Sequence, residues 1–302
     1  MKQFSVVVFG GLSILIIIFG LSMAIKPLTT SVGNLLSSAN VNGFKRYIRF
    51  TANEEEDMVT NANINLSKSR TGITADAYIV KDLTTNKTVV SHNADTLVPI
   101  ASLSKLVTAV VARKLIADND RITISRQIID TYGNTAQFRA GETFLASDLL
   151  FPLLMVSSND AAEAFAQSYG RAQFIAAMNN FTQSIGAYRS YFADPSGLSP
   201  DNRSTATDLA IILDWIRKND PTILETTALK SKTVRNHTWV NPSHFLNWST
   251  YYGGKNGYTP EAALTSAAIF IFGAQKAMYA VVTLGSEARD ADVVKLLAKI
   301  KQ

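Results

Sequence analysis

Residues 102–116, SLSKLVTAVVARKLI, form the stretch from which the fold of this sequence can be worked out. Apolar residues recur in it every three or four positions, which is the period of an α-helix with one buried face. The polar run Asp118-Asn119-Asp120 follows and predicts the end of the helix. This helix is expected to pack through its apolar face against the rest of the body.

Segments on both sides of this helix are typical of β-strands. Residues 75–83 and 88–92 flank a turn, and two apolar runs, 263–272 and 278–285, flank the turn-like residues 273–276. Further helical patterns lie at about 146–156, 160–169, 171–185 and 205–218, and an amphipathic segment at 291–301 follows the last strand. Strands at both ends of a helical middle predict an α+β domain whose first and last strands share one sheet.

The composition of the 302 residues excludes several classes of protein. With 47% apolar and 18% charged residues, the chain is too apolar for a disordered tail. It has no cysteine and three histidines (His92, His237 and His244), so neither a disulfide-stapled module nor a Cys- or multi-His-ligated metal centre is expected. The net charge of +5 is scattered along the chain, so nucleic acid is not an expected partner.

The N-terminal residues 1–27 contain an uncharged run, residues 4–25, between Lys2 and Lys26. As a helix this run would span about 33 Å, close to the ~30 Å hydrocarbon thickness of a bilayer. We expect residues 1–27 to anchor a single-pass protein in the cell membrane through residues 4–25, with its body on the extracytoplasmic side. A cleaved signal segment ending near Ser22-Met23-Ala24, and hence secretion, is the alternative.

Residues 28–73 follow this run and are rich in Ser, Thr and Asn without a sustained apolar period. They are expected to form a polar tether, which leaves residues 74–302 as the functional body.

Ser102 and Lys105 form the only S-x-x-K motif of the chain. Because they are three positions apart at the start of a predicted helix, they share one face. A lysine amine with a lowered pKa can accept the proton of a serine hydroxyl, and the helix N-terminus favours the anion that forms there. An N-capping serine followed by an exposed lysine is the structural alternative.

The motif Ser157-Ser158-Asn159 directly follows the apolar helix predicted at 146–156. The Ser157 hydroxyl and the Asn159 amide could relay a proton and hydrogen-bond a peptide group of a substrate. The same S-x-N spacing recurs at residues 38–40 and 91–93, so the motif has little specificity alone. A simple N-cap for the helix at 160–169 is the alternative.

A third motif, Lys255-Asn256-Gly257, comes just before the C-terminal strands and is the only K-x-G of the chain. A lysine on an edge strand would attract an anionic substrate and lower the pKa of a neighbouring lysine. The glycine would let the backbone of a bound peptide approach. An ordinary Gly-rich turn is the alternative.

The order S-x-x-K, S-x-N, K-x-G resembles the motif set of the serine penicillin-recognising enzymes. The flanking residues 99–105, 157–164, 194–198, 204–209 and 253–259 resemble those of the D-alanyl-D-alanine carboxypeptidases, the low-molecular-mass penicillin-binding proteins, and the likeness covers about residues 75–300. The resemblance implies a β-lactamase/transpeptidase-like α+β fold: an antiparallel sheet flanked by N- and C-terminal helices, with an all-helical subdomain inserted at about 118–205. In this chain one N-terminal transmembrane helix is expected to precede it.

The resemblance also implies a role for each motif residue. Ser102 would be the acylated nucleophile and Lys105 its base, Ser157 and Asn159 would complete the proton and substrate network, Lys255 would supply the electrostatic field, and Asn256, Gly257 and Tyr258 would contact the substrate. The backbone N–H groups of Ser102 and Tyr258 would form the oxyanion hole. The implied substrate is a peptidoglycan stem peptide ending in D-Ala-D-Ala, with β-lactams as inhibitors and neither a metal nor a cofactor.

Asn256 stands where the family usually has threonine, whose hydroxyl contacts the carboxylate of the substrate. It motivates an alternative in another class, a non-catalytic descendant that binds wall peptide or a partner protein. A β-lactamase ranks lower, because the chain lacks the E-x-x-L-N run that supplies the deacylating glutamate; a transpeptidase would differ only in its acceptor. Arg289 is a candidate second contact for the carboxylate, although a solvated arginine at a helix start is the more ordinary interpretation.

Overall fold

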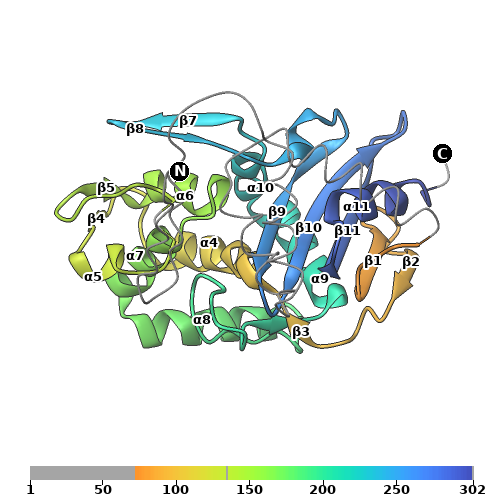
Figure 1. The fold of residues 1–302 in the computed structure, drawn as a ribbon, viewed down its shortest axis with the longest axis horizontal. Helices are drawn as coiled ribbons and strands as arrows, with labels where there is room; N and C mark the ends of the chain where they lie inside the picture. Colours follow the sequence, from red (N-terminus) through yellow and green to blue (C-terminus); the bar gives the residue numbers. More distant parts are fainter. Residues whose placement is uncertain (1–71, 134, 301–302) are drawn as a thin grey trace, which may run out of the picture. The chain divides into compact units, whose positions relative to one another are not determined.

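The computed structural model describes residues 72–133 and 135–300 (Figure 1). The predicted anchor at 1–27 and all of the predicted tether except residues 72 and 73 lie outside the described residues. In the described part of the chain, no helix is both long enough and apolar enough to span a bilayer.

A five-stranded antiparallel sheet forms one half of the described body (Figure 1). Its strands, in spatial order, are β2 (Thr88–His92), β1 (Ala77–Asp82), β11 (Ala277–Ser286), β10 (Ala263–Phe272) and β9 (Tyr251–Thr259). The first long strand pairs with the last, in a register that runs from Ala77 opposite Leu284 to Asp82 opposite Tyr279. This pairing confirms the α+β prediction in which both ends of the domain share one sheet.

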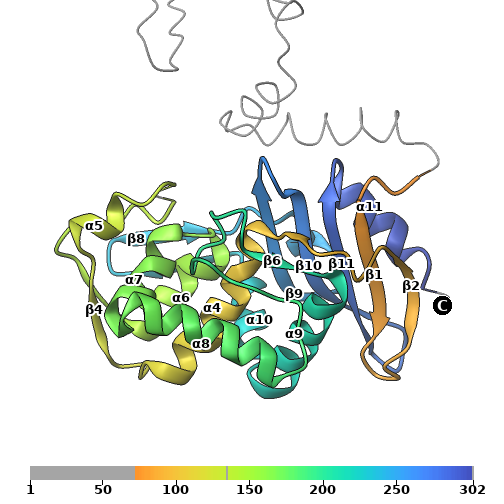
Figure 2. The same ribbon diagram turned by 90° about the horizontal axis from the view of Figure 1, so that it is seen from below.

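Helices cover both faces of this sheet, because its strands alternate apolar side chains between two clusters. Ile269 and Val282 belong to the larger cluster, which also includes residues of α9 (Ala206–Asn219). Phe270 and Val281 belong to the smaller one, which α11 (Arg289–Leu297) covers. Figure 2 shows α9 and α11 on opposite sides of the strands.

The other half of the body is helical, and four of its helices confirm the apolar periods of the sequence: α4 (Ser104–Leu115), α6 (Ala146–Met155), α7 (Asn159–Tyr169) and α8 (Arg171–Ser184). The short helices α5 (Arg126–Ile129) and α10 (Thr222–Thr227) were not predicted. The short pairs β3 (Val98–Pro99) with β6 (Arg203–Ser204), β4 (Arg121–Thr123) with β5 (Thr143–Leu145), and β7 (Ser231–Val234) with β8 (His237–Val240), together with the 3₁₀ turn η2 (His244–Asn247), were not predicted.

Helix α4 differs in two ways from the helix predicted at 102–116. It begins at Ser104, because residues Ala101–Leu103 form a separate 3₁₀ turn, η1. All residues from Ser104 to Ala112 are buried, including Lys105, whereas one buried face was expected. Helix α4 therefore runs through the core, and the turn η1 just before it lies against the edge strand β9.

Candidate active site

The turn that presents Ser102 is held from two sides. Ala101, just before it, has a φ of 49°, in the left-handed region that non-glycine residues rarely adopt. Thr265 of β10 donates a hydrogen bond to the Ile100 carbonyl (3.2 Å), and Ser104 Oγ donates one to the Ala101 carbonyl (2.9 Å). These contacts keep an otherwise unfavourable turn in place, and the turn sets Ser102 at the head of α4.

Lys105 is completely buried, and its amine makes three close contacts. Its Nζ lies 2.6 Å from the Ser196 carbonyl oxygen, 2.7 Å from Asn159 Oδ1 and 3.0 Å from Ser102 Oγ. The first two partners can only accept hydrogen bonds, so they use both N–H groups of a neutral amine. Its lone pair is then left for the hydroxyl proton of Ser102, which is the arrangement that a general base requires.

The charge state of Lys105 favours the same role. Burial, reinforced by the positive charge of Lys255, holds the pKa of the Lys105 amine well below its usual range. The carboxylates of Asp194 and Asp160 oppose this shift without cancelling it. The effect of Lys255 agrees with the prediction that a lysine in the third motif lowers the pKa of a neighbouring lysine.

The turn at residues 194–199 places the Ser196 carbonyl against Lys105. The buried Asp194 carboxylate accepts hydrogen bonds from the backbone N–H groups of Ser196 (2.6 Å), Gly197 (2.7 Å) and Ser199 (2.6 Å). This contribution was not predicted from the sequence, in which residues 194–197 (Asp-Pro-Ser-Gly) serve only as part of the family likeness. The tetrapeptide is itself a signal, since Asp followed by Pro, Ser and Gly is typical of such a turn.

The S-x-N motif caps helix α7 and also sends one side chain to Lys105. Ser158 is the N-cap of α7, and its Oγ accepts a hydrogen bond from the Ala161 N–H (3.0 Å). Asn159 reaches Lys105 through Oδ1, and its Nδ2 donates to the Tyr132 carbonyl (2.6 Å). Ser157 has a φ of 59°, and its hydroxyl forms no hydrogen bond with another described residue. The structure therefore joins Asn159, but not Ser157, to the Lys105 network.

Lys255 lies on β9, an edge strand of the sheet, and its side chain is only 6% exposed. Its Nζ donates to the Asn256 carbonyl (2.8 Å). Burial and the positive charge of Arg289 lower the pKa of Lys255 to about 7. The Lys255 amine lies on the strand that is expected to bind the substrate, and with this pKa it changes its charge near neutral pH.

Gly257 lies on β9 next to the nucleophile turn. A Cβ at this position would lie 2.9 Å from the Ser102 backbone nitrogen and 2.7 Å from Thr265 Oγ1. The absence of a side chain leaves this space open beside the Ser102 N–H. Tyr258, whose N–H is the second predicted oxyanion donor, is the next residue of the same strand.

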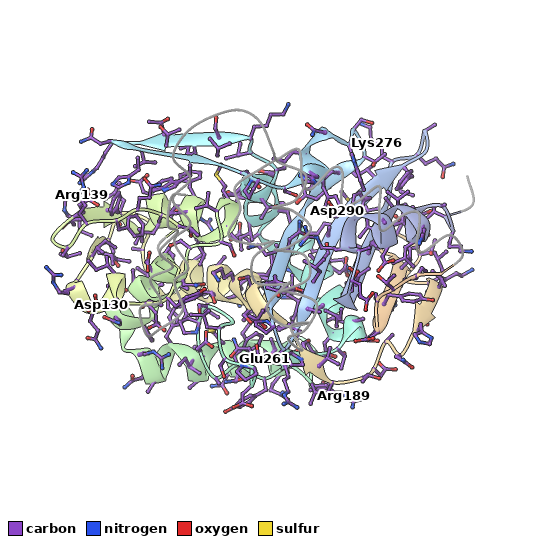
Figure 3. All side chains as sticks on the ribbon, in the orientation of Figure 1. Asp130, Arg139, Arg189, Glu261, Lys276 and Asp290 are labelled. Atoms are coloured by element: carbon purple, nitrogen blue, oxygen red, sulfur yellow. The ribbon has the colours of Figure 1, made fainter. Side chains whose placement is uncertain are left out.

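Arg289 is not the solvated arginine of the ordinary interpretation. Its side chain is 20% exposed, and its Nε donates to Asp290 Oδ1 (3.0 Å). The other oxygen of Asp290 lies 3.1 Å from His244 Nδ1, and Figure 3 shows Asp290 over the sheet, where α11 begins. Because the charge of Arg289 acts on Lys255, the two cations share one electrostatic environment.

Together these groups are equipped for nucleophilic acyl transfer. Ser102 offers the nucleophile, Lys105 the base, and the N–H of Ser102 beside Gly257 a donor for a developing oxyanion. Over residues 72–133 and 135–300, no three side chains of His, Asp or Glu gather in a group that could hold a metal ion.

A family model described as D-alanyl-D-alanine carboxypeptidase matches residues 64–284. The chain belongs to this family. A D-alanyl-D-alanine endopeptidase of Escherichia coli is 35% identical to it over 207 residues, which are 66% of this chain and 66% of the relative. A D-alanyl-D-alanine carboxypeptidase of Salmonella typhimurium is 30% identical over 246 residues, 74% of this chain and 62% of the relative. The chain thus spans slightly less than two thirds of the length of these curated relatives.

Solved structures of the family have the same fold. A D-alanyl-D-alanine carboxypeptidase from Mycobacterium tuberculosis superposes with a TM-score of 0.70 at 25% identity, over 76% of this chain and 91% of that one. Penicillin-binding protein D2 from Listeria monocytogenes, in its cefotaxime-bound form, gives 0.67 at 26% identity, over 76% of this chain and 98% of that one. The family resemblance and the transpeptidase-like α+β fold are thereby confirmed. The subdomain predicted at about 118–205 is not all-helical, because β4, β5 and β6 lie in it.

Proposed function

We propose that this chain is a serine-type D-alanyl-D-alanine carboxypeptidase, which removes the terminal D-Ala of peptidoglycan stem peptides through an acyl-enzyme on Ser102. The observation that supports it most directly is the amine of Lys105. Two acceptors, the Ser196 carbonyl and Asn159 Oδ1, occupy its N–H groups and leave its lone pair for the Ser102 hydroxyl at 3.0 Å.

The reaction would proceed in two acyl-transfer steps. Ser102 Oγ attacks the carbonyl carbon of the penultimate D-Ala while Lys105 accepts the hydroxyl proton, and the N–H groups of Ser102 and Tyr258 stabilise the oxyanion. The peptide C–N bond then breaks, and the leaving amine takes the proton from Lys105. In the second step a water molecule gives a proton to Lys105 and attacks the ester, which frees the shortened peptide and restores Ser102.

Two cations would recognise the C-terminal carboxylate of the substrate. Lys255 is buried, Arg289 is only 20% exposed, and the positive charge of Arg289 lowers the pKa of Lys255. An anion placed between them and Ser102 would therefore favour the charged form of Lys255. Asn256 would contact the same carboxylate through its amide N–H in place of a threonine hydroxyl. A β-lactam would acylate Ser102 by the same attack, and its carboxylate would occupy the same position.

Endopeptidase activity is a second candidate function, favoured by the identities of the relatives. The E. coli D-alanyl-D-alanine endopeptidase is 35% identical to this chain, whereas the S. typhimurium carboxypeptidase is 30% identical. The chemistry at Ser102 would not change, because only the leaving group differs. Its amine would belong to a second stem peptide instead of free D-Ala.

The place of action would be the outer face of the cell membrane. The uncharged run at residues 4–25 has the length of a membrane-spanning helix, and a polar tether at 28–73 would hold the enzyme near the wall. Recovery of the full chain in the membrane fraction after an alkaline wash would support this anchor. A shortened, soluble chain outside the cell would instead indicate signal cleavage.

The test of function uses the full chain, purified in detergent, with the peptide diacetyl-Lys-D-Ala-D-Ala. Carboxypeptidase activity is expected to release D-Ala, and the Ser102→Ala variant is expected to release none. A cross-linked muropeptide dimer, offered separately, distinguishes endopeptidase activity by the appearance of monomers. If the folded wild type acts on neither substrate and takes up no penicillin, the non-catalytic alternative is correct.

A further inference from the structure

Asp160 is a buried acid that no part of the proposed mechanism uses. Its side chain is 0% exposed, and neither of its carboxylate oxygens has a hydrogen-bond partner among the described residues. An isolated carboxylate in such surroundings is costly, and the usual outcome is that the group takes up a proton. Asp160 lies in the first turn of α7, where the helix dipole offsets only part of that cost.

The position of Asp160 links it to the base. It directly follows Asn159, whose Oδ1 contacts the Lys105 amine at 2.7 Å. The positive charge of Lys105 acts on Asp160, and the charge of Asp160 acts in turn on Lys105. These two titratable groups are therefore electrostatically coupled, although no hydrogen bond joins them in the structure.

Three charged groups act on Lys105, each from a different element. They are Lys255 of β9, Asp194 of the turn at 194–199, and Asp160 of α7. Lys255 favours the neutral amine. Asp194 favours the ammonium, and its carboxylate accepts hydrogen bonds from three backbone N–H groups. Asp160 also favours the ammonium when it is ionised, but its buried carboxylate has no such bonds.

We propose that Asp160 is a positioning residue that acts through Lys105: by holding a proton in the resting enzyme, it leaves the Lys105 amine neutral and ready to accept the proton of Ser102. The proposal rests on the proposed function, since it assigns Lys105 as the base. Burial, only partly opposed by the charge of Lys105, raises the pKa of Asp160 to about 7, which is consistent with a protonated acid at neutral pH.

The charge of Asp160 determines in which direction the pKa of Lys105 moves. An ionised Asp160 raises the pKa of Lys105 and favours an ammonium, which has no lone pair for Ser102. A neutral side chain at position 160 removes this stabilisation of the ammonium. Asparagine keeps the shape of the side chain and is neutral like the protonated acid, so the variant should match the wild type while Asp160 holds its proton. It should also keep Lys105 neutral at the higher pH at which Asp160 of the wild type ionises.

The experiment measures the rate at which a chromogenic cephalosporin acylates the full chain, in detergent, between about pH 5 and pH 9. In Asp160→Asn the profile is expected to coincide with that of the wild type below about pH 7 and to show faster acylation above it, where the ionised Asp160 of the wild type favours the ammonium of Lys105. Asp148→Asn is the matched control, because Asp148 is a first-turn acid of the neighbouring helix α6. Its profile is expected to superimpose on that of the wild type.

Thermal unfolding of the same proteins gives a readout that does not depend on activity. If Asp160 ionises only near pH 7 in the folded chain, its burial destabilises the fold increasingly as pH rises above the unfolded value of about 4. The Tm of Asp160→Asn is therefore expected to rise relative to the wild type over that interval.

Each result decides something. Profiles of Asp160→Asn and the wild type that superimpose over the whole pH range would overturn the proposal, because the ionisation of Asp160 would then have no effect on Lys105. An acidic limb that moves in Asp160→Asn would also overturn it, and so would loss of acylation at every pH in a folded Asp160→Asn, since the anion would then be required. Asp160→Ser, which is also neutral, repeats the test if the asparagine variant does not fold. If the wild type is not acylated at all, the proposed function fails, while the unfolding data still show whether Asp160 holds a proton.

Discussion

Replacing Gly197 by alanine is expected to slow the acylation of Ser102 by about 100-fold. A Cβ at Gly197 would lie 1.9 Å from the Ala101 carbonyl oxygen and 2.4 Å from its carbon, whereas real Cβ contacts stay above 3.0 Å. The turn at 194–199 and the nucleophile turn must therefore separate by about 1.1 Å, which brings the Cβ from 1.9 Å to 3.0 Å from the Ala101 oxygen. A displacement of about 1 Å at catalytic groups costs about 100-fold in rate, or roughly 2.7 kcal/mol of barrier.

The assay is the rate of labelling by a fluorescent penicillin, measured together with thermal unfolding. Gly186→Ala is the matched control: Gly186 has a φ of +88° against +84° for Gly197, but no atom lies within 4 Å of its Cβ position. Both variants are expected to lose about 1–2 kcal/mol of stability from the left-handed backbone. Only Gly197→Ala should lose acylation. A folded Gly197→Ala that labels within a few fold of the wild type would refute the role assigned to this contact.

Four further outcomes are expected. In the wild type the KM for a D-Ala-D-Ala peptide should rise with pH above about 7, as the positive charge of Lys255 is lost, whereas Lys255→Arg should keep KM flat; parallel profiles would contradict this. Arg289→Ala should raise KM about 10-fold or more for a peptide with a free carboxylate and hardly at all for its C-terminal amide, and equal losses on both would exclude carboxylate recognition. Gly257→Ala should lower the acylation rate by about 100-fold or more by filling the space beside the Ser102 N–H, with normal labelling as the opposing result. Asn256→Thr should lower KM about fivefold with kcat unchanged, and an unchanged KM would show that this side chain does not contact the carboxylate.

Much of the fold was predictable because its signals are local. The apolar periods that predict α6, α7, α8 and α9 end within two residues of the observed helices. The short pairs β4–β5 and β7–β8 carry no comparable period in strands of three or four residues. β4 and β5 also pair across about 20 residues, and a local pattern does not contain that information.

The site was predictable where residues three positions apart define it, and less so where distant turns complete it. Ser102 and Lys105 meet because a helical turn separates them. The contact of Lys105 with the Ser196 carbonyl joins residues 91 positions apart and uses a backbone atom. No side-chain motif in the sequence therefore predicts it. The absence of hydrogen-bond partners for the buried Asp160 carboxylate could not be predicted from the sequence either, because an acid in the first turn of a helix is normally exposed.

Peptide mapping of the full chain after incubation with a penicillin tests the central assignment most directly. The account predicts one covalent adduct, on the peptide that contains Ser102, at a mass equal to that of the intact penicillin, and none in Ser102→Ala. A Lys105→Ala variant is expected to fold and to remain almost unlabelled. An adduct on another serine, or labelling that survives Ser102→Ala, would contradict the assignment of Ser102 as the nucleophile.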